Sequence, residues 1–294
     1  MSMDRREFLQ TTALASTALM ATAGVVPASE KKNVKMCDVG WIWEGQGLDP
    51  GVPPSIYGLS QGAAYFGLRR VNLLFHPNDA HALGLLKDMK EVTCDITKWK
   101  AGWNPDGAMK WEIRGEQARV VAEAEKVSAL SLDFPNVTGA FFDDLMGRMK
   151  KEGYTHEDFA RVSAAAKSVN PNLKLWTVVY THELDEDSFW NSLSPFVDIV
   201  NLWIWNSRDI KDQETYVIQC RDLFPDKPIV MGCYLRDYTI PGPVPVDRVL
   251  FQMTSVADLL ERDMIQGFSL LASVLIDSHR LQAEAVRDFI AAHS

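Results

Sequence analysis

Apolar and polar residues alternate along the chain in two different rhythms after Lys35. Short apolar or β-branched runs, typical of strands, are separated by longer segments whose apolar residues recur at helical spacing, as in Val120, Ala124 and Val127. The strand-like runs begin near residues 36, 71, 92, 137, 173, 197, 229 and 267. The helix-like segments cover residues 54–68, 81–90, 116–132, 155–169, 186–192, 211–223, 246–263 and 280–293. The pattern therefore predicts eight strands, each followed by a helix.

Eight strand–helix repeats predict an α/β fold in which one parallel sheet closes into a (β/α)8 barrel, the TIM barrel. An open doubly wound sheet is the alternative, and it normally carries a glycine-rich phosphate loop after its first strand. The segment 45–51, GQGLDPG, lacks the third glycine at the required spacing, and no helical pattern begins within it. Because no repeat or second linker interrupts the series, we expect a single domain over residues 29–294.

The first 28 residues predict an export signal that is removed from the mature protein. Residues 4–10, DRREFLQ, resemble the twin-arginine motif of bacterial secretion signals, in which two arginines precede a Phe-Leu pair. A weakly apolar stretch runs from residue 11 to 26, and residues 26–28 offer small side chains for cleavage. The resemblance implies export of the folded protein by the twin-arginine route to the periplasm or the extracellular space.

Composition and charge exclude several classes of protein. The 294 residues are 47% hydrophobic and 23% charged, with a formal net charge of -9. This apolar content excludes a disordered chain, and the acidic balance argues against nucleic-acid binding, which needs a basic surface. Beyond residue 28 no uninterrupted apolar run approaches the ~20 residues of a membrane span. None of the four cysteines forms a Cys-x-x-Cys pair, so we expect reduced, structural thiols.

Candidate chemistry gathers at the carboxyl ends of the predicted strands, where barrel enzymes have their active sites. Seven of the nine tryptophans fall at these ends or in the loops that follow: Trp41, Trp43, Trp99, Trp103, Trp111, Trp203 and Trp205. Indole rings stack on the C–H faces of sugars, while polar side chains bind the hydroxyl groups. The group as a whole favours a carbohydrate site. The competing interpretation is that these tryptophans only fill the barrel and pack its loops.

The fourth predicted strand carries the most specific motif. Residues 137–145, VTGAFFDDL, resemble the Gly-x-x-x-Asp ending of strand four in many barrel glycoside hydrolases. In those enzymes the acidic residue four positions after the glycine points into the barrel mouth, and the match implies this role for Asp143. Strand periodicity agrees, since Gly139, Phe141 and Asp143 share a face. Asp144 is expected to turn toward the adjoining loop or helix, where capping of that helix is the alternative to its role as a further catalytic candidate.

Glycosidic cleavage needs a second carboxyl group across the scissile bond. We expect Glu183 to supply it, because Glu183 ends the neighbouring strand and adjacent strands lie ~4.8 Å apart. Glu44 and Asp237 are the reserve candidates. A like-charged neighbour would raise the pKa of one carboxyl group and give an acid near neutral pH.

Aromatic and polar residues at the same strand ends are the predicted substrate contacts. On the sixth strand Asn201, Trp203 and Trp205 share the face toward the lumen, and the two indoles are expected to be sugar platforms. The remaining predicted contacts are Trp43, Glu44, His76, Trp99, Tyr180, His182, Tyr234, Arg236 and Asp237.

Two other functions stay open on the sequence. A non-catalytic glycan-binding barrel would use the same aromatic residues without an aligned acid pair. A metal-dependent sugar isomerase or lyase would use His76 and His182 as ligands together with Asp143 and Glu183. No metal-binding spacing such as His-x-His supports the metal site, so no cofactor is expected. The expected partner is a carbohydrate, and the sequence does not indicate an oligomeric state.

Overall fold

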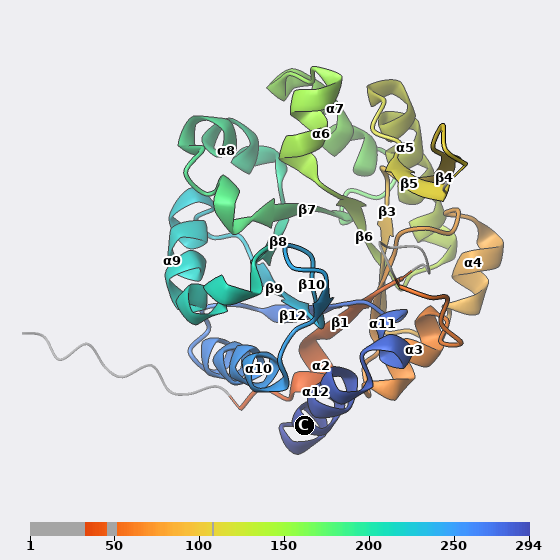
Figure 1. Ribbon diagram of the computed structural model, residues 1–294. Helices are drawn as coiled ribbons and strands as arrows, with labels where there is room; N and C mark the ends of the chain where they lie inside the picture. Colours follow the sequence, from red (N-terminus) through yellow and green to blue (C-terminus); the bar gives the residue numbers. More distant parts are fainter. Residues whose placement is uncertain (1–32, 46–51, 108) are drawn as a thin grey trace, which may run out of the picture. The chain divides into compact units, whose positions relative to one another are not determined.

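The computed structural model of the protein describes residues 33–45, 52–107 and 109–294, with the backbone alone at 109–111. Eight parallel strands close into a barrel in the order β1, β2, β3, β6, β7, β8, β9, β12, and β12 pairs with β1 (Figure 1). The predicted (β/α)8 fold is confirmed. These strands are β1 (Gly40–Trp43), β2 (Arg70–Leu73), β3 (Glu91–Asp95), β6 (Val137–Phe142), β7 (Lys174–Tyr180), β8 (Ile199–Trp203), β9 (Ile229–Tyr234) and β12 (Gly267–Leu271). The predicted export segment lies outside the described residues.

Helices surround the barrel (Figure 1). The main ones are α3 (Leu59–Tyr65), α4 (Ala80–Leu85), α5 (Gln117–Asp133), α6 (Leu145–Glu152), α7 (His156–Ala166), α8 (Asp187–Leu193), α9 (Gln213–Leu223), α10 (Val246–Glu261) and α12 (Arg280–Ala292). Short helical segments are α2 (Met36–Val39), α11 (Leu275–Ser278), η1 (Thr181–Glu183), η2 (Ser194–Phe196) and η3 (Ser207–Asp212). Helix α7 begins at a capping box, in which the Thr155 hydroxyl accepts the Asp158 N–H and the Asp158 carboxylate accepts the Thr155 N–H.

Three local predictions are wrong. Residues 36–39 form helix α2, and the first strand begins only at Gly40. The sequence pattern does not predict helix α6, which begins at Leu145, three residues after the last residue of β6. The interval between the third and fourth barrel strands is not a plain loop, since β4 (Trp99–Trp103) and β5 (Met109–Ile113) pair as an antiparallel hairpin. A second small pair, β10 (Arg236–Asp237) and β11 (Gly242–Pro243), follows β9.

Aromatic rings fill the interior of the barrel. The Trp43 ring meets Phe141 and Trp203 edge to face, each at a centroid distance of 5.1 Å, and Trp41 meets Trp176 at 4.8 Å. Trp43 is 6% exposed and Trp203 is 1% exposed. The prediction that these two indoles contact sugar is therefore corrected: they pack the barrel core, as interior side chains of a closed barrel must.

All four cysteines are free, as expected, and Cys94, Cys220 and Cys233 are buried. Burial in apolar surroundings raises the pKa of Cys94 to about 12, which keeps its thiol protonated and unreactive. Across the described ranges, no helix has both the length and the apolar character that a membrane crossing requires.

Candidate active site

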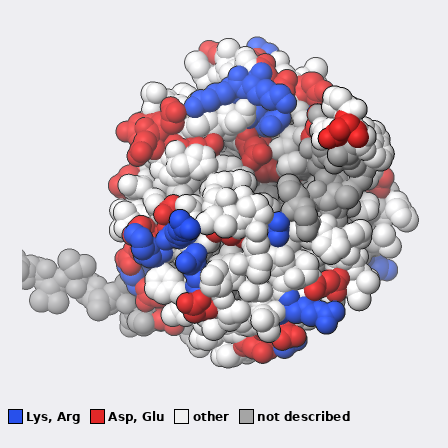
Figure 2. Space-filling model, in the orientation of Figure 1, with Lys and Arg blue, Asp and Glu red and all other residues white. Residues whose placement is uncertain are grey.

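A cleft of about 610 Å³ opens at the carboxyl ends of four neighbouring strands, β6, β7, β8 and β9. Figure 2 shows a hollow in which acidic side chains are exposed, bordered by basic side chains over α6. The residues that line the cleft are Asp144, Gly147, Arg148, Tyr180, Thr181, His182, Glu183, Trp205, Asn206, Asp209 and Thr239. The cleft therefore combines carboxyl groups, one guanidinium group and aromatic rings.

Asp144 reaches the cleft because the backbone leaves the strand at this residue. Its φ of 49° and ψ of 45° are left-handed, so the alternation of strand β6 does not continue past Asp143. The Asp144 Oδ1 accepts a hydrogen bond of 2.7 Å from the Tyr180 hydroxyl. Asp144 occupies the N-cap position of α6 but its side chain makes no capping hydrogen bond. The expectation that Asp144 caps the helix is therefore wrong.

Asp143 continues the inward face of β6 and lies beneath the cleft. Its side chain is 3% exposed, is absent from the cleft lining, and accepts a 3.0 Å hydrogen bond at Oδ2 from the Trp99 indole N–H. Burial raises the pKa of Asp143 well above its usual range, and the charges of Asp144 and Asp95 raise it further. These effects favour the neutral carboxylic acid. The expectation that Asp143 is the carboxyl group exposed at the mouth is corrected in favour of Asp144.

Glu183 follows β7 directly, in the turn η1. Its Oε2 accepts the backbone N–H of Tyr180 at 3.0 Å, and this bond fixes the carboxyl group against the end of the strand. Burial, together with the negative charge of Asp144, raises the pKa of Glu183 to about 7. Glu183, the predicted second carboxyl group, lines the same cleft as Asp144. Its raised pKa allows it to carry a proton near neutral pH.

Aromatic rings form one wall of the cleft. Trp205 is 38% exposed, meets the Tyr180 ring edge to face at 5.4 Å and stacks on Tyr238 at 5.6 Å. His182 stacks on Tyr180 at 5.4 Å, with 12° between the ring planes. Burial lowers the pKa of His182, which favours the neutral imidazole. Of the two indoles predicted as platforms on the sixth strand, Trp205 alone presents a face to the cleft.

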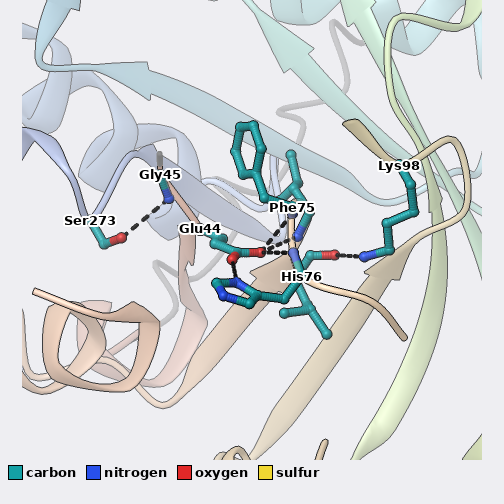
Figure 3. A network of polar contacts seen from close by, with 8 residues as sticks. Glu44, Gly45, Phe75, His76, Lys98 and Ser273 are labelled. Carbon is teal, nitrogen blue, oxygen red and sulfur yellow. Dashed lines mark hydrogen bonds and ion pairs between the residues drawn. The ribbon is translucent and has the colours of Figure 1, made fainter. Parts of the chain in front are cut away.

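Glu44 and His76 lie on the other side of the barrel mouth, at the ends of β1 and β2 (Figure 3). The Glu44 Oε2 accepts the backbone N–H groups of Leu74 at 2.8 Å and Phe75 at 2.7 Å, and Oε1 pairs with the His76 Nδ1. Burial acts to raise the pKa of Glu44, but the hydrogen bond and charge of His76 outweigh it and leave this pKa lowered. Glu44 is thus an ionised anchor for the loop after β2, and neither residue lines the cleft.

Asp237, the other reserve candidate for the second carboxyl group, also accepts hydrogen bonds that stabilise a loop. Asp237 Oδ1 accepts the N–H of Thr239 at 2.8 Å and of Ile240 at 3.1 Å, and Oδ2 accepts the Ser207 hydroxyl. Burial alone would raise the pKa of Asp237, and these hydrogen bonds reverse the effect and lower it. The hydrogen bonds of Asp237 thus hold the turn after β10.

Three further predicted contacts are buried and do not line the cleft. Asn201 donates from Nδ2 to the Val230 carbonyl at 2.8 Å inside the barrel. The Tyr234 ring packs on Trp203 at 4.7 Å, and Arg236 is 7% exposed in β10. Trp99 contacts the site indirectly, through its hydrogen bond to Asp143.

No family model matches the chain, and no curated protein matches it in sequence. Solved structures match its fold. A chitinase from Chromobacterium violaceum superposes with a TM-score of 0.53 at 12% identity, over 86% of this chain and 99% of the chitinase chain. The PgaB (BpsB) glycoside hydrolase domain from Bordetella bronchiseptica gives 0.53 at 10% identity, over 86% and 99%. A β-glucuronidase from Bacteroides uniformis gives 0.54 at 13% identity over 81% of this chain, which spans only 30% of that enzyme's chain.

These likenesses establish a shared fold. The chain shares its (β/α)8 barrel fold with these glycoside hydrolases. At identities of 10–13% the reaction and the substrate do not follow from the fold, because one barrel supports many chemistries.

The predicted metal ligands are not assembled. His76 pairs with Glu44, His182 stacks on Tyr180, and Asp143 binds the Trp99 indole. Among the residues that the structure describes, no three His, Cys, Asp or Glu side chains form a group that could hold a metal ion.

Several cleft residues were not predicted from the sequence: Gly147, Arg148, Thr181, Asn206, Asp209 and Thr239. Arg148 lies on α6, a helix that the periodicity did not reveal. The spacing of four residues between Asp144 and Arg148 was the available signal, because side chains four apart share a helix face.

Proposed function

We propose that the protein hydrolyses glycosidic bonds in a glycan bound across this cleft. The observation that carries the proposal is the presence of two carboxyl groups, Asp144 and Glu183, in one cleft beside the exposed indole of Trp205. A carboxyl pair is what glycoside hydrolysis requires, and an exposed ring is a surface on which a sugar can stack.

The two carboxyl groups differ in the form that their surroundings favour. A pKa of about 7 leaves Glu183 able to carry a proton at neutral pH, so it is suited to protonate the glycosidic oxygen as the bond breaks. Burial raises the pKa of Asp144, and the Tyr180 hydroxyl and the positive charge of Arg148, which favour the ionised carboxylate, offset part of this rise. We assign Asp144 the role of the ionised partner, which attacks the anomeric carbon or activates the water that does so. Water supplies the proton and the hydroxyl group that the two products gain.

We propose that Asp143, beneath the cleft, acts on Asp144 and Trp99 and not on the substrate itself. A neutral Asp143 beside Asp144 avoids a second negative charge beneath the cleft, and its bond to Trp99 fixes the start of the β4–β5 hairpin. Removal of this carboxyl group would break the hydrogen bond to Trp99 beneath the pair without removing a group from the cleft lining.

The test is an activity screen of the purified protein on aryl glycosides and oligosaccharides, of which at least one is expected to be cleaved. Glu183→Gln and Asp144→Asn should each lower kcat by about 100-fold or more, with an unchanged circular dichroism spectrum. Asp185→Asn is the matched control, because Asp185 is an exposed carboxylate two residues after Glu183, and it should keep the wild-type rate.

Three results would contradict this assignment. Glycan binding without cleavage would favour the non-catalytic barrel. Wild-type rates in both carboxyl variants would remove the roles given to this pair. Stoichiometric metal, with activity lost on chelation, would favour a metal-assisted reaction.

Export by the twin-arginine route is a separate proposal, carried by the sequence of residues 4–10. A fusion of residues 1–28 to a reporter that functions only after export should be active in cells with the twin-arginine system and inactive in cells without it. Substitution of Arg5 and Arg6 by lysine should abolish export, and continued export would contradict the proposal.

A further inference from the structure

Arg148 lines the cleft beside Asp144, and its positive charge acts to lower the pKa of that carboxyl group. It lies one helical turn after Asp144, and its backbone N–H donates to the Asp144 carbonyl at 2.9 Å. The buried Nε has no hydrogen-bond partner, and no hydrogen bond or ion pair of the guanidinium group occurs among the described residues. A buried Nε–H group without a partner is costly, because it has lost water without gaining an acceptor.

The position of this side chain is set by packing. A Cβ at Gly115 would lie 3.1 Å from the Arg148 Cδ, so the glycine after the β4–β5 hairpin leaves room for the aliphatic part of the side chain. This contact favours one orientation of the side chain. Arg148 is half-buried and is one of the residues that line the cleft, so its side chain does not extend freely into solvent.

The charges around the cleft favour an anionic ligand at this one position. Arg148 is the single Lys or Arg in the cleft lining, and Lys150 and Lys151 follow it on α6, where Figure 2 shows the basic border of the hollow. Three acidic residues, Asp144, Glu183 and Asp209, also line the cleft, and their negative charge repels an anion from the positions beside them. An acidic group of a ligand would therefore bind in one orientation, against Arg148.

We propose that the cleft selects glycans that contain uronic acid units, and that Arg148 binds the sugar carboxylate through two parallel N–H···O hydrogen bonds. A planar carboxylate matches the fork of the guanidinium group, and such bidentate pairs are strong and directional. The proposal rests on the hydrolase function proposed above, because it names the substrate class of the same cleft.

The experiment compares the binding of matched ligands to the purified full-length protein. Oligouronides and the same oligosaccharides with their carboxyl groups reduced to neutral hydroxymethyl groups are titrated by calorimetry, with Glu183→Gln used to prevent turnover. Uronide binding is expected to be at least about 10-fold tighter than binding of the neutral ligand. Arg148→Gln should remove this preference, and Arg148→Lys should restore it only in part, because lysine keeps the charge and loses the fork. Lys151→Gln, which removes an exposed charge of the same helix, should change the preference less than twofold at 0.15 M salt.

The outcomes separate this proposal from the hydrolase function. Arg148-dependent uronide binding without cleavage of any glycan would support the recognition site and overturn the hydrolase function. Cleavage of neutral glycans with no preference for uronides would overturn the recognition site alone. An equal loss of affinity for both ligands in Arg148→Gln, with an unchanged melting temperature, would also overturn it.

Discussion

The substitution Tyr180→Phe tests the electrostatics of the carboxyl pair most directly. The Tyr180 hydroxyl donates to Asp144 Oδ1 at 2.7 Å, while the backbone N–H of the same residue donates to Glu183. Phenylalanine keeps the backbone bond and the ring, and it removes only the hydroxyl group. A hydrogen bond to a charged group contributes about 1.5–3 kcal/mol, and one pKa unit corresponds to about 1.4 kcal/mol. Because the lost bond favours the ionised carboxylate, the pKa of Asp144 should rise by about 1–2 units.

The rise can be measured by ¹³C NMR titration of the Asp144 carboxyl group, which does not depend on finding a substrate. If the protein cleaves a glycan, the acidic limb of kcat/KM should move to higher pH by the same amount. Tyr238→Phe is the control, since Tyr238 stacks on Trp205 and lies in the same aromatic wall. An Asp144 pKa that stays constant or falls in Tyr180→Phe would refute the reasoning.

Three further perturbations have defined outcomes. A Cβ at Gly232 would lie 2.1 Å from the Trp203 ring, so Gly232→Ala should lower the free energy of unfolding by about 1–3 kcal/mol in a urea titration, and an unchanged midpoint would contradict the packing argument. Trp205→Ala should weaken glycan binding about 10-fold, and undiminished affinity would exclude Trp205 as a platform. His76→Gln should lower the free energy of unfolding more at pH 5–6 than at a more acidic or a more alkaline pH. The reason is that the folded protein lowers the pKa of Glu44 and raises the pKa of His76. The pair therefore loses its stabilising effect as pH falls through the Glu44 pKa and as pH rises through the His76 pKa. A loss of stability that is independent of pH would contradict this.

The barrel itself was predictable because its signals are local and repeated. Runs of β-branched and apolar residues located seven of the eight barrel strands to within a few residues. The capping box at Thr155 located the start of α7. The first strand was placed too early because Met36 is apolar and precedes Gly40 without a turn signal, so the four residues of α2 read as part of the strand.

The site was harder to predict because it depends on where the alternation of inward and outward side chains along a strand ends. Period two places Asp143 inward and says nothing of Asp144, whose left-handed backbone turns its carboxyl group into the cleft. The same rule assigned Trp203 to the lumen correctly, but a closed barrel fills its lumen with side chains, so an inward indole below the mouth is core. Trp205, two residues beyond Trp203, lies high enough to be 38% exposed.

The barrel mouth is divided between two uses of its carboxyl groups. At the ends of β1 and β2, Glu44 is saturated with backbone N–H groups and an imidazole, which lowers its pKa and anchors a loop. At the ends of β6 and β7, Asp144 and Glu183 have fewer partners, and burial raises the pKa of both. A carboxylate that accepts several hydrogen bonds is stable and unreactive, whereas one that is buried with few partners can exchange a proton near neutral pH. The number of donors around each carboxyl group, rather than its place at a strand end, therefore separates the loop anchor from the candidate acid.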